Sequence, residues 1–189
     1  MKMLPSASLL TALLTLTGLG PATTQAAPSL PSEVVATYKP KGLAGAQGRA
    51  KAAQTFLDAL DEERKAEALL PLDSPERAKW TNVPPRGPQG GVRLGDLDRG
   101  QLEKACDFLA SALSEQGYKQ AIAILLADDE LLDNGKPRAG FGAENSWLAI
   151  FGKPDAKKPW AMQFDGHHLA INATYAGASA CYSPSFIGT

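Results

Sequence analysis

Apolar residues in the first half of the chain recur every three or four residues, the spacing of one face of an α-helix. This stripe predicts a helix over residues 46–69, which Pro71 ends because proline cannot continue a helix. A second, short helix is expected to begin at Ser74-Pro75, since serine caps helix N-termini and proline is tolerated at the first helical position. The stripe of the first helix consists of Ala50, Ala53, Phe56, Leu57 and Leu60.

Two further helices are expected before the middle of the chain gives way to a different pattern. Asp98 and Gln101 have the spacing of a capping box, so a third helix should begin at Asp98. Gly117 is expected to end that helix. A fourth helix is predicted over residues 118–132 and should end at Asn134-Gly135. The short connection between the last two helices is typical of an antiparallel pair.

The last third of the chain has the pattern of strands. Asp165-Gly166 lies between alternating apolar residues, which predicts a two-residue hairpin turn. The chain is helical first and β second, so we expect an α+β fold in which about four helices pack on a small antiparallel β-meander. The expected strands cover residues 147–151, Trp160–Phe164, His167–Tyr175 and 179–182.

The predicted turn determines which side chains share a face of the sheet. It places Phe164 opposite His167, and Gln163 opposite His168. His167 would then lie on the apolar face, either as a core histidine or as a ligand. His168 would lie on the polar face, which is either the solvent side or the lining of a cleft. The apolar face would hold Trp160, Met162, Phe164, His167, Leu169, Ile171, Ala173 and Tyr175, and the polar face Ala161, Gln163, His168, Ala170, Asn172 and Thr174.

The N-terminal residues have the order of a secretory signal peptide. Lys2 precedes an apolar run, and small residues follow, so cleavage is expected after Ala26 or Ala27. Residues 27–44 are rich in proline and are expected to be an extended lead-in. We therefore expect residues 1–26 to be a signal peptide, residues 45–189 to be a single domain, and the protein to be periplasmic or secreted, with no stable membrane span after cleavage.

Composition excludes few classes of protein. Apolar residues make up 44% of the chain and charged residues 21%, as in ordinary globular proteins, and the net charge is -1. This balance is unlike that of nucleic-acid-binding proteins, which carry a basic face. Cys106 and Cys181 either pair, as the oxidising compartment would allow, or are two buried thiols.

Candidate chemistry centres on the two histidines. His168, with Gln163 and Asn172 on the same expected face, is the proposed catalytic set. His167, His168 and Glu144 could form a mixed site for a divalent metal, since imidazole and carboxylate are both metal ligands. The chain has no His-Glu-x-x-His, no Gly-x-Ser-x-Gly and no phosphate-binding loop.

Several short motifs resemble one known family. They are Trp160-x-x-x-Phe164-x-Gly166-His167-His168-x-x-x-Asn172; Glu76-Arg77 followed by Trp80-x-Asn82-x-Pro84; Leu94-x-Asp96-Leu97; Leu113-Ser114 followed by Gly117-Tyr118; Phe151-Gly152-x-Pro154; and Pro184-x-Phe186-x-Gly188. This pattern, from Phe56 to Gly188, resembles the domain-of-unknown-function 3500 family of exported bacterial proteins. The resemblance implies no particular activity. Members of the family look longer than this chain, so we expect that it is either a short form or lacks a C-terminal part of the usual family length.

Two hypotheses for function follow. The first is an exported, His-based and metal-dependent hydrolase-like enzyme. The second is a non-catalytic exported module that binds a small molecule or a cell-envelope ligand, or is purely structural, with the Gly-His-His hairpin stabilising the fold.

Overall fold

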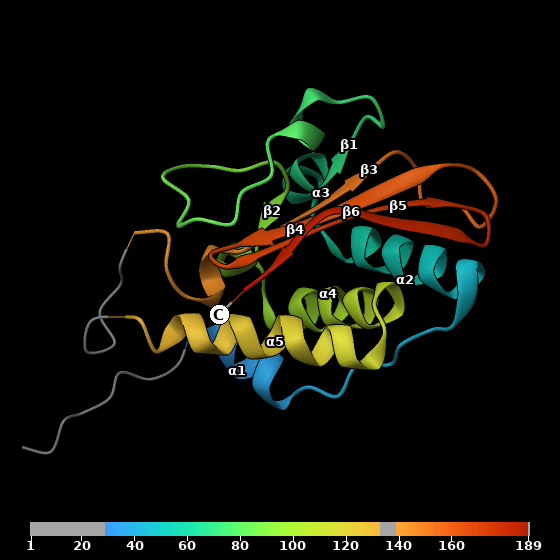
Figure 1. Ribbon diagram of the computed structural model, residues 1–189. Helices are drawn as coiled ribbons and strands as arrows, with labels where there is room; N and C mark the ends of the chain where they lie inside the picture. The colour runs from blue at the N-terminus through green and yellow to red at the C-terminus, as the bar shows by residue number, and fades with distance from the viewer. Residues whose placement is uncertain (1–28, 133–138, 189) are drawn as a thin grey trace, which may run out of the picture.

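The computed structural model describes residues 29–132 and 139–188. A sheet separates a layer of helices from the long loop of residues 71–91 (Figure 1). The α+β prediction is therefore confirmed, with helices packed on a C-terminal sheet. The helices on the side of the sheet opposite this loop are α1 (Leu30–Thr37), α2 (Gly45–Ala59), α4 (Arg99–Ala112) and α5 (Glu115–Asp129).

Two expectations about the first helices were wrong. The segment expected to be extended contains α1, which Ser29 caps by accepting a hydrogen bond from the N–H of Ser32. The helix expected over residues 46–69 is two helices, α2 and α3 (Glu62–Ala68). The chain breaks at Asp61, whose carboxylate accepts the N–H of Arg64 at 2.9 Å and so starts α3. The charged residues 61–65, which were expected to continue the first helix, therefore contain the N-cap of a second helix.

Caps also determine the later helices. The capping box of Asp98 and Gln101 begins α4, as predicted. Gly117 does not end that helix but lies in the first turn of α5, where its N–H donates to the hydroxyl of the N-cap Ser114 at 3.1 Å. The predicted stop at Asn134-Gly135 lies outside the described residues. The short helix predicted at Ser74 is the 3-10 helix η1 (Pro75–Ala78).

The sheet has the order β1-β3-β4-β5-β6, with β2 pairing with β3. β3 to β6 form the expected antiparallel meander, whereas β1 runs parallel to β3 and makes the sheet mixed. The two shortest strands were not predicted, because a pair of residues leaves no periodicity. The strands are β1 (Leu69–Leu70), β2 (Val92–Arg93), β3 (Trp147–Phe151), β4 (Trp160–Gly166), β5 (Leu169–Ala176) and β6 (Ser179–Ile187).

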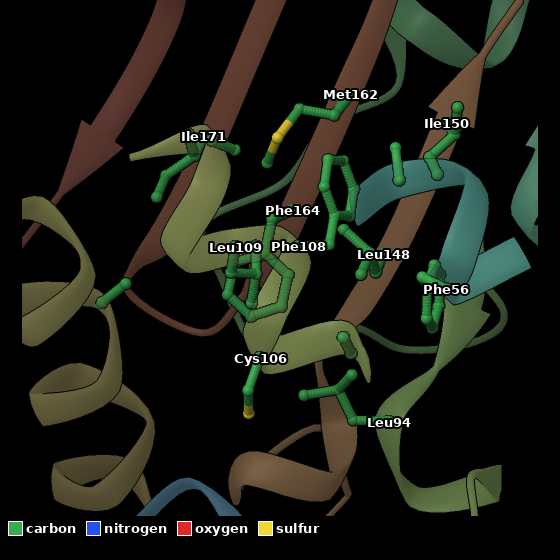
Figure 2. Close-up of a cluster of buried hydrophobic side chains, with 14 of the residues drawn as sticks. Phe56, Leu94, Cys106, Phe108, Leu109, Leu148, Ile150, Met162, Phe164 and Ile171 are labelled. Atoms are coloured by element: carbon green, nitrogen blue, oxygen red, sulfur yellow. The ribbon is translucent and has the colours of Figure 1, made fainter. Parts of the chain in front are cut away.

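The main core lies between the sheet and the helices. Phe56 of α2 and Phe108 of α4 are both fully buried against the strands (Figure 2). Their rings stack, with centroids 6.4 Å apart, and Phe108 also contacts Trp160 at 6.1 Å. The strands contribute Leu148, Ile150, Met162, Phe164 and Ile171 to this core. Among the described residues, no helix is long and apolar enough to cross a membrane.

The opposite face of the sheet is covered by loop residues. A small separate cluster of Ala149, Phe151 and Ala161 packs there against Leu70 and Leu72. The rest of this face is polar, and it is described below.

Candidate functional site

The hairpin turns at His167-His168, not at the predicted Asp165-Gly166. Gly166 pairs with Leu169, so the two histidines form the connection. His168, the second residue of the turn, has a φ of 62°, a left-handed conformation that few non-glycine residues adopt. Its N–H donates to the carbonyl of Asn82 at 2.9 Å. This hydrogen bond stabilises a turn at the two histidines in place of the turn that Asp-Gly favours.

The change of turn alters the pairing but not the faces of the strand residues. Gln163 was predicted opposite His168 and lies opposite Asn172, four residues further along. An even shift leaves every strand side chain on its predicted face. His168 leaves the polar face, however, and roughly 10 Å of strand separates the turn from Gln163. The structure thus brings Gln163 and Asn172 together and places His168 apart from them.

His167 joins the hairpin to the end of α5. Its Nδ1 lies 2.5 Å from Oδ1 of Asp128, and its side chain is only 9% exposed. The other carboxylate oxygen of Asp128 accepts the N–H of Gly142 at 2.7 Å. The imidazole also contacts the rings of Phe141 and His168, with centroid distances of 4.6 and 4.0 Å. This pairing orients His167 and fixes the turn in place.

Asp128 was not among the residues predicted for the site, although the sequence carries a signal for it. It lies three residues after Leu125 and six after Ile122, so it falls on the apolar stripe of α5. A carboxylate on a buried stripe needs a partner. The structure provides it with the imidazole of His167.

A chain of amide hydrogen bonds crosses the loop-covered face. Nε2 of Gln163 donates to Oδ1 of Asn172 at 2.8 Å, and Nδ2 of Asn172 donates to the carbonyl of Pro184 at 2.9 Å. Gln163 is 3% and Asn172 9% exposed. The polar face is therefore not open to bulk solvent, and loops cover it.

Asp165 lies on the same face, one alternation from Gln163. Burial raises the pKa of its carboxyl to about 7, and the N–H of Thr81, which donates to Oδ2 at 3.3 Å, only partly offsets this effect. Its Oδ1 is buried without a hydrogen-bond partner among the described residues. Desolvation of an unpaired carboxylate favours the neutral form, so near neutral pH Asp165 titrates.

Arg77 borders a small pocket on this face, next to Thr174. One guanidinium nitrogen donates to the hydroxyl of Thr174 at 3.0 Å and another to the carbonyl of Leu72 at 3.1 Å. The pocket has a volume of about 300 Å³ and is also lined by Ser74, Asn172 and Pro184.

A larger groove, of about 1300 Å³, lies beside the loop of residues 83–91. Gly91 and Gly140 hold this loop at its two ends. Gly91 has a φ of 107° and approaches the backbone of Leu148 so closely that a Cβ would lie 2.7 Å from it. Gly140 has a φ of 79°, and a Cβ there would lie 2.5 Å from the carbonyl oxygen of Pro85. The lining combines Leu70, Val83, Pro84, Pro85, Pro88, Phe141 and Trp147 with Glu67, Glu76, Arg86, Arg93, Asp96 and Asn145.

The residues predicted for a metal site are not gathered into one. Glu144 pairs with Arg93 at 3.3 Å, while the two histidines contact each other in the hairpin turn. Within residues 29–132 and 139–188, no three His, Cys, Asp or Glu side chains lie close enough together to hold a metal ion.

The two cysteines are unpaired. Cys106 is buried on α4, and burial raises the pKa of its thiol to about 11, whereas Cys181 is exposed on β6. Of the two alternatives for these residues, the structure has free thiols, of which one is buried and one exposed.

The fold is a two-layer α+β domain in which the histidine hairpin lies at one end of the sheet. The family model DUF3500, described as "Protein of unknown function", matches residues 44–189. The chain therefore belongs to the DUF3500 family, as its motifs indicated. No curated protein matches it. No solved structure matches it.

Proposed function

We propose that this chain is exported and acts as a non-catalytic module that binds an extended cell-envelope ligand in the groove beside residues 83–91. The groove, of about 1300 Å³, carries the proposal. Sites for single small molecules usually have volumes of roughly 300–1000 Å³, so this one suits a segment of a longer ligand. The glycine contacts of Gly91 and Gly140 hold the loop in place, which reduces the entropy lost on binding.

The lining supports a ligand with both apolar and charged groups. Phe141 supplies aromatic surface beside three prolines, and the largely buried Trp147 borders the groove. Arg86, in the same lining, makes no hydrogen bond or ion pair with any other residue that the structure describes, so its guanidinium is available to an anionic group. Glu67 and Asp96 offer acceptors for hydroxyl or amino groups.

Binding is tested with soluble fragments of the bacterial cell envelope, namely muropeptides and lipopolysaccharide-derived oligosaccharides. Isothermal titration of the purified chain should detect at least one of them. Val83→Lys, which places a charge in the groove at a 59% exposed residue, should weaken that binding about tenfold. Leu43→Lys, at a 38% exposed residue outside the groove lining, is the control and should bind normally. If no fragment binds, or if both variants bind like the unaltered chain, the proposal is wrong.

Export is tested separately, by N-terminal sequencing of the protein recovered from the periplasm and the medium. A mature N-terminus at Ala27 or Pro28 is expected, because small residues precede the proposed cleavage site. A chain that keeps Met1 and remains in the cytoplasm would contradict export.

A second candidate function is a His-based, hydrolase-like activity, and the Asp128–His167 contact of 2.5 Å favours it. A carboxylate that orients an imidazole is the arrangement used by general-base histidines. Chromogenic esters, phosphoesters and glycosides would be assayed with the unaltered chain, Asp128→Asn and His168→Ala. Turnover that is lost in Asp128→Asn supports this activity, and loss in His168→Ala would assign the turn histidine to it as well. Absence of turnover by the unaltered chain on all three substrate classes leaves the binding module as the function.

A further inference from the structure

β6 is the last strand in the order of the sheet, and its outer side has no neighbouring strand among the described residues (Figure 1). All nine of its residues are exposed. The strand carries no charged side chain, although charged residues are a common protection of strand edges. Three of its large side chains are exposed: Tyr182 (43%), Phe186 (41%) and Ile187 (48%).

Pro184 does not protect this edge. Prolines on edge strands block pairing where their missing N–H faces outward. Here the carbonyl of Pro184 accepts the side chain of Asn172 on β5, at a β-bulge between the pairs of Ile171 and Ala173. Since the N–H and C=O positions of one strand residue point to the same side, the missing N–H of Pro184 faces inward as well.

The backbone groups that face outward can be derived from the register. Ala176 and Ser179 close the turn into β6 as a bonded pair, so Ser179 and Cys181 point to β5. Gly188 donates to the carbonyl of His168, so Gly188, Phe186 and Pro184 also point to β5. The groups that remain for a partner belong to Ala180, Tyr182, Ser185 and Ile187.

We propose that β6 pairs antiparallel with β6 of a second copy of this chain, so that the two sheets become one continuous sheet. In one register, the outward-facing backbone N–H and C=O groups of all four residues find hydrogen-bond partners on the second copy. It places Tyr182 opposite Ser185 of the second copy, and Ala180 opposite Ile187 of the second copy, with the twofold axis between Ser183 and Pro184. The bulge lies at this axis in both strands, so the extra residue of one strand meets the extra residue of the other.

Side-chain directions agree with this register. Ala180, Tyr182, Ser185 and Ile187 pair with Tyr175, Ala173, Ile171 and Leu169 of β5, which all lie on the helix-covered face. Each pair across the twofold axis therefore lies on one face, as antiparallel pairing requires. Because the two strands would be identical, charges of one sign on β6 would lie near charges of the same sign on the second copy, whereas an uncharged strand meets no such repulsion.

The register is tested by a disulfide between copies. Cys181 and Phe186 of the second copy are directly opposite each other as a non-bonded pair, whose Cα atoms are about 4.5 Å apart in such ladders, within reach of a disulfide. Phe186→Cys should therefore form a covalent dimer on mild oxidation, seen on a non-reducing gel. Within one chain these two positions are about 17 Å apart along the strand, too far for an internal bond.

The control is Phe186→Cys combined with Cys181→Ser, which should remain uncross-linked. Light scattering of the unaltered chain over a range of concentrations should show a monomer–dimer equilibrium. Ser185→Pro, which removes an outward N–H, should weaken dimerisation about tenfold or more, while Ser185→Ala should not. A chain that stays monomeric, or a Phe186→Cys variant that does not cross-link, overturns the proposal and leaves the edge to a different partner.

Discussion

The two faces of the sheet are stabilised in different ways. The face toward the helices is a continuous apolar core, in which Phe164 and Leu148 are fully buried. The face toward the loop of residues 71–91 buries Gln163, Asp165 and Asn172. Apolar burial is favourable by itself, whereas buried polar groups cost free energy unless each one is paired.

This difference shows where the fold gains stability and where it can respond to conditions. Among the described residues, the strand side chains that face the helices, such as Leu148, Met162 and Phe164, include no carboxylate, so their contribution to stability is expected to vary little with pH. The loop-covered face holds Asp165, whose Oδ1 is unpaired among the described residues. We therefore expect mutations on the first face to change stability most, and mutations on the second to change its pH dependence.

Phe164→Ala should have the largest effect. It leaves a cavity in the main core and should lower the free energy of unfolding by about 3–5 kcal/mol, as measured by urea denaturation. Phe151→Ala is the matched variant on the other face, where the ring packs in a cluster of only a few residues. Loops can collapse around the smaller cavity, so it should cost about 3 kcal/mol or less. Equal losses would contradict the contrast between the faces.

Asp165→Asn should remove a pH dependence of stability. Because burial raises the pKa of this carboxyl from 3.8 to about 7, the folded state holds a proton that the unfolded state has already released. Stability is then highest below the unfolded pKa and falls as pH rises through the folded pKa. Between about pH 5 and about pH 8 the unaltered chain should lose roughly 2–3 kcal/mol more than Asp165→Asn.

The control for that experiment is Asp155→Asn. Backbone N–H groups of Lys158 and Lys157 lower the pKa of the half-buried Asp155 carboxyl, so it stays ionised across the same pH window. This variant should therefore keep the pH dependence of the unaltered chain. A pH profile of Asp165→Asn that matches the unaltered chain would show that Asp165 is not the titrating group.

Asn172→Ala should have the smallest of these effects. It leaves Nε2 of Gln163 and the carbonyl of Pro184 without their partner. The adjacent pocket of about 300 Å³ can admit water to replace the lost bonds. The expected loss is about 1 kcal/mol. In the Asn172→Ala background, Gln163→Ala should lower the free energy of unfolding by less than it does in the unaltered chain, because the hydrogen bond between the two side chains is already lost. If the two losses add exactly in a double-mutant cycle, Gln163 and Asn172 are not coupled.

The hairpin shows how far local pattern carries a prediction. Alternation correctly assigned the strand side chains of β4 and β5 to their faces, because an apolar face must meet the core whatever the turn. The position of the turn was wrong. Asp165 pairs with Trp147 of β3, and the histidines are held by Asp128 and by the carbonyl of Asn82. These contacts join residues far apart in sequence, so no local rule contains them.

The candidate site divides in the same way. Gln163 and Asn172 were expected on one face and lie there, bonded to each other. The groove and Arg77 were not foreseen, because a groove depends on the path of a loop over the sheet and leaves no periodicity in the sequence.

Sequence alone determined the family, the α+β order of elements, the capping box of α4 and the faces of the hairpin. Each of these depends on interactions between near neighbours or on the burial of an apolar stripe. Only the tertiary structure decided that His167 pairs with Asp128, that loops bury the polar face, and that β6 is a neutral strand with no neighbour on its outer side among the described residues. Those features follow from packing between distant segments, where the free energy of a buried contact outweighs the preference of a local turn.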